Sequence, residues 1–447
     1  MNNLKKQILS VAVATSTVLS CVPVSMAAIP ADVQGTRYEE PVQILSALNI
    51  MVGDENGAYR LDDTIIRSEV AKMAIHALGL EDAAESSKGQ TMFDDVSAEH
   101  WANGYINLAV SQGIIEGDGD GNFRPNAPIS YAEAMTIMVR ATGYTVSAEE
   151  NGGYPHGYMK TGTSNGLAKN VQGSYSDKIS RGNVAYLTTN ALESKLMEQT
   201  GFGSDGKYEI TEKTLLKDKL KVTKDTGRIT AIENTSLTGS SSLAKGQIKI
   251  DNKTYETAYN MNNLLGYNVT YYVKNEGKND ESVILAMPIQ NQNNDLTISS
   301  ELFSKLTTKN GNTAIEYFKD ENTSKTNTAE ISSDATLIYN GKYQAMDKNL
   351  IDLTDKSGNI TLLDSNKNGK YDIVFVKNYE NIVVDSISST GKIVDKYSQK
   401  VLKLDDTVDF RITKGLEEIS VSDLAEYDVL SVAASLDKEL YEVEVTN

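Results

Sequence analysis

Two short stretches place oxygen-bearing side chains at the alternating spacing of a calcium-binding loop. The first, GDGDGNFRP at 117–125, has aspartate or asparagine at every second position. Counted from Glu116, glycine falls at loop position 6, but Ala127 stands at position 12, where such a loop needs a closing carboxylate. Because that carboxylate is missing, we interpret this stretch as a glycine-dependent turn whose Phe123 packs into a core.

The second stretch, DSNKNGKYD at 364–372, follows the ligand order of an EF-hand-like loop more closely. Phe375 stands at position 12 in place of glutamate, and the continuation YDIVFV has the pattern of a strand rather than a helix. An Asn-Gly hairpin turn explains the same residues without a metal, so both interpretations stay open. No cofactor other than Ca²⁺ is indicated. The candidate ligands are Asp364, Asn366, Asn368 and Asp372.

No constellation of catalytic residues is recognisable, and the chain is not expected to be an enzyme. The only cysteine, Cys21, lies near the N-terminus, and His76, His100 and His156 have no ligand spacing between them. Neither a Gly-x-Ser-x-Gly motif nor a phosphate-binding Gly-x-x-x-x-Gly-Lys-Ser/Thr loop occurs. Two carboxylates that meet only in the fold would leave no trace in the sequence, so a glycosidase-type pair stays open.

The N-terminus has the pattern of a secretory signal peptide. Lys5 and Lys6 precede an apolar run from Ile8 to Val24, and small residues follow, which predicts removal of residues 1–28. A lipoprotein cleavage site ending at Cys21 is the alternative. No later segment approaches the roughly 18 apolar residues that span a membrane. We therefore expect a secreted protein that a contact other than a transmembrane segment holds at the cell.

The net charge of the chain restricts its partners. The formal charge is -18, and removal of the signal peptide would make it more negative. A chain this acidic is not expected to bind nucleic acid or an anionic membrane through its overall field. An anionic partner would have to be met by a local group of arginines.

The turn at 117–125 belongs to an internal repeat. GDGDGNFRPNAPISYAE at 117–133 matches GDENGAYRLDDTIIRSE at 53–69 without a gap, and a shorter third copy lies at 152–201. Apolar residues at helical spacing stand on both sides of each turn, which predicts a helical hairpin in every copy. One hairpin cannot bury its apolar face alone, but three packed around an axis can. Cap-type residues precede the second helices at Thr64, Ser130 and Ser180, and Glu133 completes a capping box.

The second copy carries five motifs in a fixed order. They are FDDV at 93–96, WA at 101–102, GIIEG at 113–117, GNFRP at 121–125 and ISYAE at 129–133. This series resembles the S-layer homology (SLH) module, and the resemblance covers about residues 30–200. It implies an all-α, pseudo-threefold spindle of three helical hairpins. It further implies that grooves of the spindle bind a pyruvylated secondary cell-wall polysaccharide and so anchor the protein non-covalently to a Gram-positive-type cell wall.

The same resemblance indicates which residues would contact the polymer. Arg67 and Arg181 stand at the family's arginine position, where a guanidinium pairs with the carboxylate of a pyruvate ketal. Asp32, Asp95 and Trp101 stand at other groove positions, where they would form hydrogen bonds or stack on a sugar. Purely structural roles are the alternative: packing for Trp101, a salt bridge for Arg67 and a helix cap for Asp95.

Three positions depart from the pattern of the family. Tyr131 replaces the arginine in the second copy, Ile66 replaces Thr or Ser in the first, and Asn183 stands where the third copy usually has an acid. The groove beside Tyr131 is expected to be inactive or to accept a different sugar. We therefore expect at least one functional groove, but not three.

After about residue 203 the helical periodicity ends. Short alternating runs such as GRITAIEN and NVTYYVKN, separated by Gly, Asn and Asp, predict strands of sandwich or small-barrel modules. The polar stretch PIQNQNNDLT at 288–297 is a candidate boundary between two of them. The pattern of this half of the chain does not indicate a particular activity.

The expected protein is multidomain, with a helical N-terminal region followed by β-rich modules that project outward as a structural array or spacer. Self-assembly into a surface layer stays open. A wall-anchored glycan hydrolase is one alternative, and an adhesin or carbohydrate-binding protein that uses the Tyr-rich segments 255–272 and 371–379 is another. The expected boundaries are 1–28 for the signal peptide, 29–83, 91–149 and 150–203 for the SLH modules, and 205–288 and 296–447 for the β-rich modules, the last of which has room for two.

Overall fold

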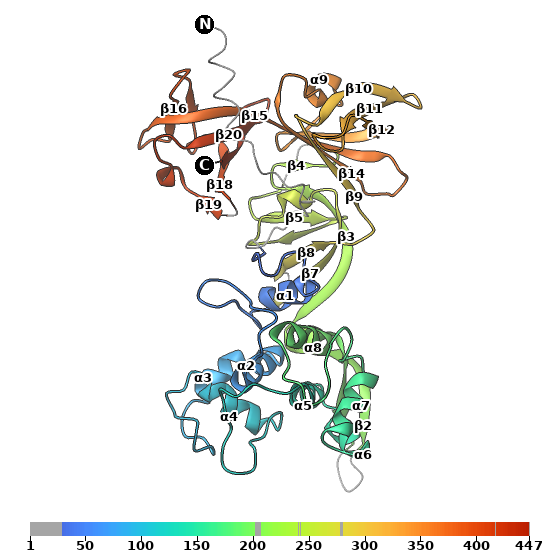
Figure 1. Ribbon diagram of the computed structural model, residues 1–447, viewed down its shortest axis with the longest axis vertical. Coiled ribbons are helices and arrows are strands. Elements are labelled where there is room, and N and C mark those ends of the chain that lie inside the picture. The colour runs from blue at the N-terminus through green and yellow to red at the C-terminus, as the bar shows by residue number, and fades with distance from the viewer. Residues whose placement is uncertain are drawn as a thin grey trace.

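The structure is a computed structural model that describes residues 29–201, 207–239, 241, 243–277, 280–415 and 417–446. The predicted signal peptide at 1–28, with Cys21, lies outside the described residues. The molecule is elongated, with helices at one end and strands in the middle and at the other end (Figure 1). A helical N-terminal region followed by β-rich domains was expected from the sequence and is confirmed.

Three helical hairpins form the helical end. We call α1–α2, α4–α5 and α7–α8 the first, second and third hairpins. The short helices α3 and α6 precede the second and third hairpins and were not predicted. The helices are α1 (Glu39–Ala47), α2 (Arg67–Ala77), α3 (Glu81–Ser86), α4 (Asn103–Ser111), α5 (Tyr131–Ala141), α6 (Thr145–Glu150), α7 (His156–Ser164) and α8 (Arg181–Glu193).

The second helix of each hairpin begins at a cap. In α5 the Ser130 side chain accepts a hydrogen bond from the Glu133 N–H, and Glu133 accepts one from the Ser130 N–H, so the predicted capping box is confirmed. Ser180 likewise caps α8. The prediction of Thr64 as the cap of α2 is wrong. The cap position falls on Ile66, whose side chain has no oxygen, and its N–H is bound by the carboxylate of Glu69 instead.

A ring of three backbone hydrogen bonds joins the hairpins. The N–H of Ile65 donates to the carbonyl of Ile179, Ile129 donates to Ile65, and Ile179 donates to Ile129. All three isoleucines are at most 2% exposed. Each hairpin thus gives one donor and one acceptor, and the pattern closes on itself without an unpaired group.

The first N–H groups of the second helices extend this cyclic pattern. Those of Arg67, Tyr131 and Arg181 donate to carbonyls in the turn of the neighbouring hairpin, at Ala127, Asp177 and Asp63, respectively. Helix N-termini leave their first N–H groups without intrahelical partners, so these bonds satisfy donors that would otherwise be buried and unpaired. The first hairpin contacts the second, the second contacts the third, and the third contacts the first.

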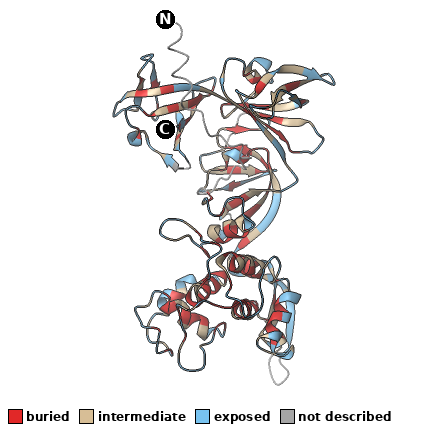
Figure 2. Ribbon diagram, viewed as in Figure 1, coloured by how far each residue is buried: buried red, intermediate tan, exposed pale blue. Residues whose placement is uncertain are grey.

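The apolar core of the helical end continues into the strands. In α2 and in α5, nine of eleven residues are buried. Figure 2 shows buried faces turned inward along the helical end and along the neighbouring strands. Tyr272 and Leu285, from two strands of the β region, belong to the same core as the hairpins. Among the described residues, no helix is long and apolar enough to cross a membrane.

Strands begin earlier than the sequence indicated. Helix α8 ends at Glu193, and β1 (Lys195–Gln199) pairs with β2 (Tyr208–Thr214) in an antiparallel hairpin. The range 150–203 predicted for the third module therefore includes a strand that does not belong to the helical hairpin. A turn of π-helix at Leu215–Lys219 follows β2.

The next strands close into a small barrel. Strand order is β4-β3-β5-β6-β8-β7, and β3 also pairs with β7, so the sheet returns to its start. Most of the tyrosines that the sequence offered as a ligand-binding strip at 255–272 are buried: Tyr255, Tyr267 and Tyr271 lie in the core of this barrel, and Tyr272 lies in the core shared with the hairpins. The strands are β3 (Val222–Ile232), β4 (Thr235–Ser236), β5 (Gln247–Ile250), β6 (Lys253–Glu256), β7 (Asn268–Gly277) and β8 (Asp280–Pro288).

The remaining strands surround two separate cores, which we call the middle and terminal β domains. One long strand, β15 (Tyr371–Ile387), runs through both. Its first half pairs with β12 and β14, and its second half with β16 and β20. The other elements are β9 (Asn294–Ser299), β10 (Phe303–Lys309), β11 (Asn312–Phe318), β12 (Thr326–Tyr339), β13 (Lys342–Gln344), α9 (Lys348–Ile351), β14 (Ser357–Asp364), β16 (Lys392–Asp395), β17 (Val401–Lys403), β18 (Asp409–Lys414), β19 (Glu417–Ile419), β20 (Val429–Ala434) and β21 (Leu440–Val445).

Candidate functional site

Arg67 lies at the start of α2 and reaches into the second hairpin. Its side chain is 7% exposed and pairs with Glu133 at 2.9 Å between Nη1 and Oε1. It also donates from Nε to the Phe123 carbonyl at 2.9 Å and from Nη2 to the Glu116 carbonyl at 3.1 Å. The guanidinium lies 5.0 Å from the centroid of the Phe123 ring. Burial lowers the pKa of Arg67, and the charge of Glu133 opposes this effect.

Glu133 uses its two carboxylate oxygens for different tasks. Oε2 accepts from the Ser130 N–H at 2.7 Å and caps its own helix, while Oε1 holds Arg67 of the neighbouring hairpin. Burial acts to raise the pKa of Glu133, but hydrogen bonds from Ser130 and the charge of Arg67 outweigh it and lower the pKa. One residue therefore fixes both a helix start and a junction between hairpins.

The same arrangement recurs between the third and first hairpins. Arg181 donates from Nε to the Tyr59 carbonyl at 2.8 Å and from Nη1 to Glu69. Glu69 accepts from the Ile66 N–H with its other oxygen, at 3.2 Å. A longer bond of 3.5 Å joins Arg181 Nη2 to the Val52 carbonyl. The side chain of Arg181 is 14% exposed, so it is slightly more open to solvent than that of Arg67.

The junction between the second and third hairpins lacks both charged partners. Tyr131 stands in place of the arginine and is 5% exposed, and burial raises the pKa of its hydroxyl. Asn183 stands in place of the glutamate, and its Oδ1 accepts from the Gln172 N–H at 3.1 Å. At the repeat position of Phe123 is Gly173, where an added Cβ would lie 4.0 Å from the Tyr131 ring. Two of the three departures seen in the sequence, Tyr131 and Asn183, thus fall on one junction.

Asp95 binds the turn of its own hairpin. Its two oxygens accept from the N–H groups of Phe123 at 2.8 Å and Arg124 at 2.7 Å. Because Arg67 holds the carbonyl of the same Phe123, the structure brings Arg67 and Asp95 together at one turn. The position is not a helix cap, so the alternative role considered for Asp95 is wrong.

Asp32 has the equivalent place in the first hairpin. One of its oxygens accepts from the N–H groups of Tyr59 and Arg60, both at 2.8 Å. Arg181 holds the carbonyl of Tyr59, so Asp32 and Arg181 form the second pair of predicted site residues that meet.

The turn at 117–125 is closed by its own atoms. The Asp118 N–H donates to the Asn122 carbonyl, and the Asp118 carboxylate pairs with Arg124. Phe123 is fully buried, and Tyr59 at the matching position is 6% exposed. The prediction of a structural turn with its aromatic residue in the core is confirmed.

Trp101 lies apart from the arginine junctions. It is 48% exposed, and its ring lies 5.8 Å from that of His100 in a stacked arrangement. Its side chain is therefore not the core packer that the sequence left as an alternative. Tyr154, which repeats Trp101 in the third copy, is 58% exposed, and Tyr175 in the following turn is 46% exposed. The alignment of Tyr154 with Trp101 was the signal that could have added Tyr154 to the candidate residues.

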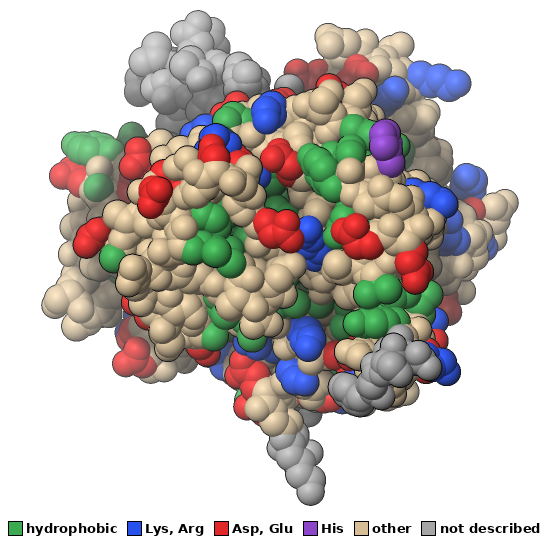
Figure 3. All heavy atoms as spheres, turned by 90° about the horizontal axis from the view of Figure 1, so that it is seen from below, with side chains coloured by type: hydrophobic (Ala, Val, Ile, Leu, Met, Phe, Trp, Pro, Cys, Tyr) green, Lys and Arg blue, Asp and Glu red, His purple; other side chains and the backbone are tan. Residues whose placement is uncertain are grey.

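Two arginines in the turns of the first and second hairpins are paired with acids. Arg60 contacts Asp63 at 2.7 Å, and Arg124 contacts Asp120 at 2.6 Å. The face at the helical end shows acidic and basic side chains beside one another, with hydrophobic patches between them (Figure 3). An anionic ligand would therefore meet a surface of mixed charge rather than a uniformly basic one.

The loop at 364–372 is held by internal hydrogen bonds. Asp364 is 2% exposed, and its two oxygens accept from the N–H groups of Asn368 at 3.2 Å and Gly369 at 3.0 Å. Asp372 accepts from Ser365 and pairs with Arg228 at 3.0 Å, a cation that a bound metal would have to face. Asn366 and Asn368 accept from N–H groups within the loop. The calcium site stays a prediction.

Comparison with known proteins identifies the helical repeat. Residues 31–71 and 93–135 match the S-layer homology domain. The middle cell wall protein of Brevibacillus brevis is 29% identical over 314 residues, which are 63% of this chain and 30% of that protein. The surface layer protein of Brevibacillus choshinensis is 28% identical over 313 residues, 63% of this chain and 28% of that protein. The cell surface protein of Thermoanaerobacter kivui is 27% identical over 441 residues, 96% of this chain and 52% of that protein.

The chain is a cell-surface protein with S-layer homology modules. Its place is therefore the cell wall or cell surface. The aligned part spans between 28% and 52% of the length of these relatives. The two matched segments contain Asp32, Arg67 and Asp95 together with Trp101, whereas Arg181 lies in the third hairpin, beyond the match. The names of the three relatives are those of wall and surface proteins, not of enzymes.

Proposed function

We propose that residues 29–203 form a three-module spindle that anchors the protein to the cell wall by binding a pyruvylated secondary cell-wall polysaccharide. The observation that carries this proposal is the repeated arginine junction. Arg67 and Arg181 stand at equivalent positions, and each presents a planar fork beside the turn of the next hairpin. Planar guanidinium groups suit the bidentate recognition of a carboxylate, and a pyruvate ketal is a carboxylate attached to a sugar.

The arginines have capacity left for a ligand. Arg67 donates one N–H to each of the Phe123 and Glu116 carbonyls and one to Glu133, and the Asp118 carboxylate lies 3.8 Å from Nη2. A guanidinium carries five N–H donors, so two of them form no hydrogen bond with another described residue. A ligand carboxylate at the remaining donors would add to the ion pair with Glu133 rather than replace it. The pair therefore holds the fork in one orientation, which reduces the conformational entropy that binding would otherwise cost.

Exposed aromatic rings would contact the sugar itself. Trp101 and Tyr154 occupy equivalent positions in neighbouring hairpins, and both are about half exposed, at 48% and 58%. An exposed ring with no packing role in the core is available to cover the apolar face of a sugar. The junction at Tyr131 has no cation, so we assign the carboxylate contacts to the other two junctions.

The β region would act as a spacer or as part of a surface array. Its support is the elongated shape, in which the strands extend away from the hairpins (Figure 1), and the name "surface layer protein" of one relative. Self-assembly through these domains is part of the same proposal.

A co-sedimentation experiment tests the anchoring. Purified cell walls would be mixed with the protein before and after chemical removal of the pyruvate ketals. We expect the wild-type chain to sediment with intact walls and to stay in solution with depyruvylated walls. Trp101→Ala should weaken sedimentation, whereas Lys213→Arg, at an exposed residue of β2 outside the helical hairpins, should leave it unchanged. Equal sedimentation with both kinds of wall would refute the role of the ketal.

A further inference from the structure

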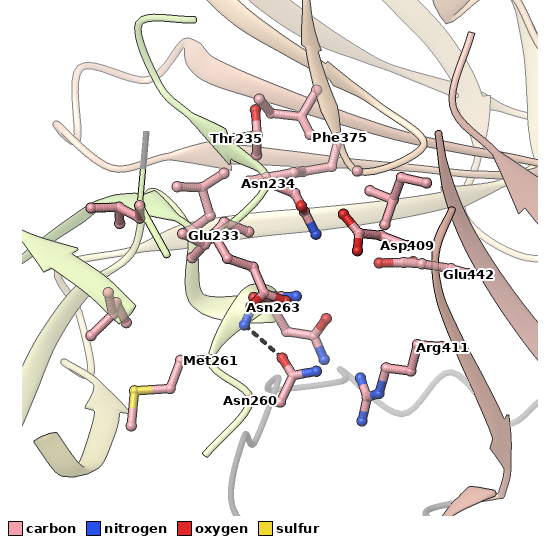
Figure 4. A pocket seen from close by; sticks show the side chains of 18 of the residues that line it. Glu233, Asn234, Thr235, Asn260, Met261, Asn263, Phe375, Asp409, Arg411 and Glu442 are labelled. Atoms are coloured by element: carbon pink, nitrogen blue, oxygen red, sulfur yellow. Dashed lines mark hydrogen bonds between the residues drawn. The ribbon is translucent and has the colours of Figure 1, made fainter. Parts of the chain in front are cut away.

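A cavity lies where the barrel meets the middle and terminal β domains. Its volume is about 720 Å³, within the range of roughly 300–1,000 Å³ for small-ligand sites. The lining comes from three parts of the chain that are distant in sequence: residues 232–267 of the barrel, 297–379 of the middle domain and 409–442 of the terminal domain. Figure 4 shows side chains from these parts facing a common space.

Three polar side chains in the cavity have no partner among the described residues. Asn234 and Asn263 come from the barrel, and Asp409 comes from β18 on the opposite side. None of them makes a side-chain hydrogen bond or ion pair with another described residue, although each carries donors or acceptors that face the space. Amide and carboxylate groups without a protein partner are available to form hydrogen bonds with the hydroxyl groups of a ligand.

Neighbouring charged groups are already paired and fix the walls. Lys377 contacts Glu442 at 2.6 Å, and Arg411 contacts Glu418 at 2.8 Å. These pairs join β15 to β21 and β18 to β19 at the edge of the cavity. Their charges cancel locally, so they add hydrogen-bonding capacity without a strong field.

The net charge of the lining disfavours an anionic ligand. Its acidic residues are Glu233, Asp409, Glu418 and Glu442, and its basic residues are Lys245, Lys377 and Arg411. The acids exceed the bases by one, so a phosphate or a carboxylate would meet net repulsion. This cavity therefore differs from the arginine junctions, which offer a buried cation.

Aromatic rings complete the lining. Phe375 and Tyr379 come from β15, Tyr259 from the barrel, and Phe410, 36% exposed, from β18. Two of the contributing segments, 255–272 and 371–379, are the Tyr-rich segments that the sequence analysis associated with an adhesin or carbohydrate-binding protein. The rings that reach the cavity are a small part of those segments, since most of the barrel tyrosines are buried in the core.

We propose that this cavity binds a neutral oligosaccharide of a few rings. Sugar hydroxyls both donate and accept hydrogen bonds, which matches unpaired amide and carboxylate groups, and the C–H face of a sugar packs against aromatic rings. The nearly balanced charge selects a neutral glycan over the acidic polymer proposed for the hairpins. A ligand held by all three domains at once also ties their relative positions together.

The test is calorimetric titration of the full chain with neutral trisaccharides: chitotriose, cellotriose, maltotriose and xylotriose. We expect saturable binding of at least one of them at a single site. Asp409→Ala combined with Asn263→Ala should weaken that binding about tenfold or more, because two hydrogen-bonding groups are lost. Both residues are exposed, so folding should be unaffected, which a thermal unfolding curve would check. Asp406→Ala and Asn327→Ala, at exposed positions outside the cavity, are the matched controls.

Three results would overturn the proposal. The first is that none of the four trisaccharides binds at millimolar concentration. The second is binding that survives the double change at full strength, which would place the sugar site elsewhere in the chain. The third is tighter binding of trilysine than of any sugar, which would assign the cavity to a cationic peptide.

Discussion

The hairpins and the β domains are joined in different ways. At each hairpin junction, backbone hydrogen bonds are joined by one side chain, Arg67, Tyr131 or Arg181, that enters the turn of the next hairpin. In the β region the backbone itself crosses the junction, because β15 pairs with strands of the middle domain and then with strands of the terminal domain. Residue identity therefore determines the side-chain part of a hairpin junction, whereas strand pairing determines the junction in the β region.

The difference explains why two of the three departures from the repeat, Tyr131 and Asn183, fall on one junction. With Tyr131 in place of an arginine at one hairpin junction, a glutamate opposite it would have no cation to meet, and Asn183 stands there instead. A carboxylate kept at that place would be partly buried without its partner, which is costly. A backbone junction carries no such requirement, since strand pairing tolerates many side chains.

The largest effect is expected at a hairpin junction. Arg67→Ala should lower the free energy of unfolding of the helical region by about 3 kcal/mol, because it leaves Glu133 without its buried partner. Arg60→Ala, which removes a solvent-exposed pair, should cost much less than Arg67→Ala. Chemical denaturation followed by circular dichroism would measure both. Similar losses for the two variants would show that burial does not distinguish the junction pair.

The side chain of Asn340 stabilises the junction between the middle and terminal β domains. Its substitution should have the next largest effect on stability. Asn340 is 3% exposed, donates to the carbonyls of Asn378 at 3.2 Å and Ala434 at 2.6 Å, and accepts from the Asn378 N–H at 2.8 Å. Asn340→Asp removes the donors and should cost about 2 kcal/mol. Asn291→Asp is the control, since Asn291 also has a positive φ but is exposed. An unfolding midpoint equal to that of the control would contradict the role of this side chain.

The paired departures can be reversed one at a time. Tyr131→Arg alone should destabilise the hairpins by about 2 kcal/mol, because it buries a cation with no acid opposite it. Adding Asn183→Glu should recover part of the loss, with a coupling free energy of about 1 kcal/mol in a double-mutant cycle. Additive effects of the two changes would mean that positions 131 and 183 do not face each other.

Acid should weaken a junction that contains a carboxylate. The pKa of Glu133 is lowered in the folded protein, so its contribution is present above the ordinary value of 4.5 and is lost as the pH falls through the folded pKa. Glu133→Gln should therefore reduce the loss of stability between pH 5 and lower pH by about 1 kcal/mol. Thermal unfolding across that range would measure it. If the variant lost stability at low pH to the same extent as the wild type, Glu133 would not contribute to acid destabilisation.

Calcium should have the smallest effect. A weak extracellular site with a Kd of about 1 mM would stabilise the protein by about 0.4 kcal/mol at 1 mM calcium. Asp364→Asn should abolish that increment if the loop at 364–372 is the site, whereas magnesium should not replace calcium. If calcium still stabilised Asp364→Asn, the ion would bind elsewhere. If calcium did not stabilise the wild-type chain, the predicted site would be wrong.

The sequence predicted the parts of the fold that repeat. Copies of one motif in register indicated the hairpins, and the capping box at Ser130 and Glu133 gave the start of α5. Three features had no such signal. The ring through Ile65, Ile129 and Ile179 consists of backbone bonds that any buried residue could make. Arg67 and Arg181 were predicted as ligand contacts, while their ion pairs with glutamates depend on which hairpins are neighbours.

The cavity in the β region was also beyond the reach of the sequence. Its lining joins residues as far apart as Asn234 and Glu442, and single sequences carry no record of such distant contacts. Strand alternation predicted β structure correctly, but not that β15 would continue through two domains. The start of β1 within the range assigned to the third module was missed for a related reason, because a short strand after a helix gives only a few residues of pattern.

The central claim is that a pyruvate carboxylate on the wall polymer is held at the arginine junctions. Its most direct test is calorimetry of the full chain with the purified polymer, with and without its ketals, for the wild type and for Arg67→Lys combined with Arg181→Lys. The lysines keep the charge but lose the fork. We predict that removal of the ketals and the double change each weaken binding at least about tenfold. Equal affinity of the wild-type chain for both forms of the polymer would contradict the account.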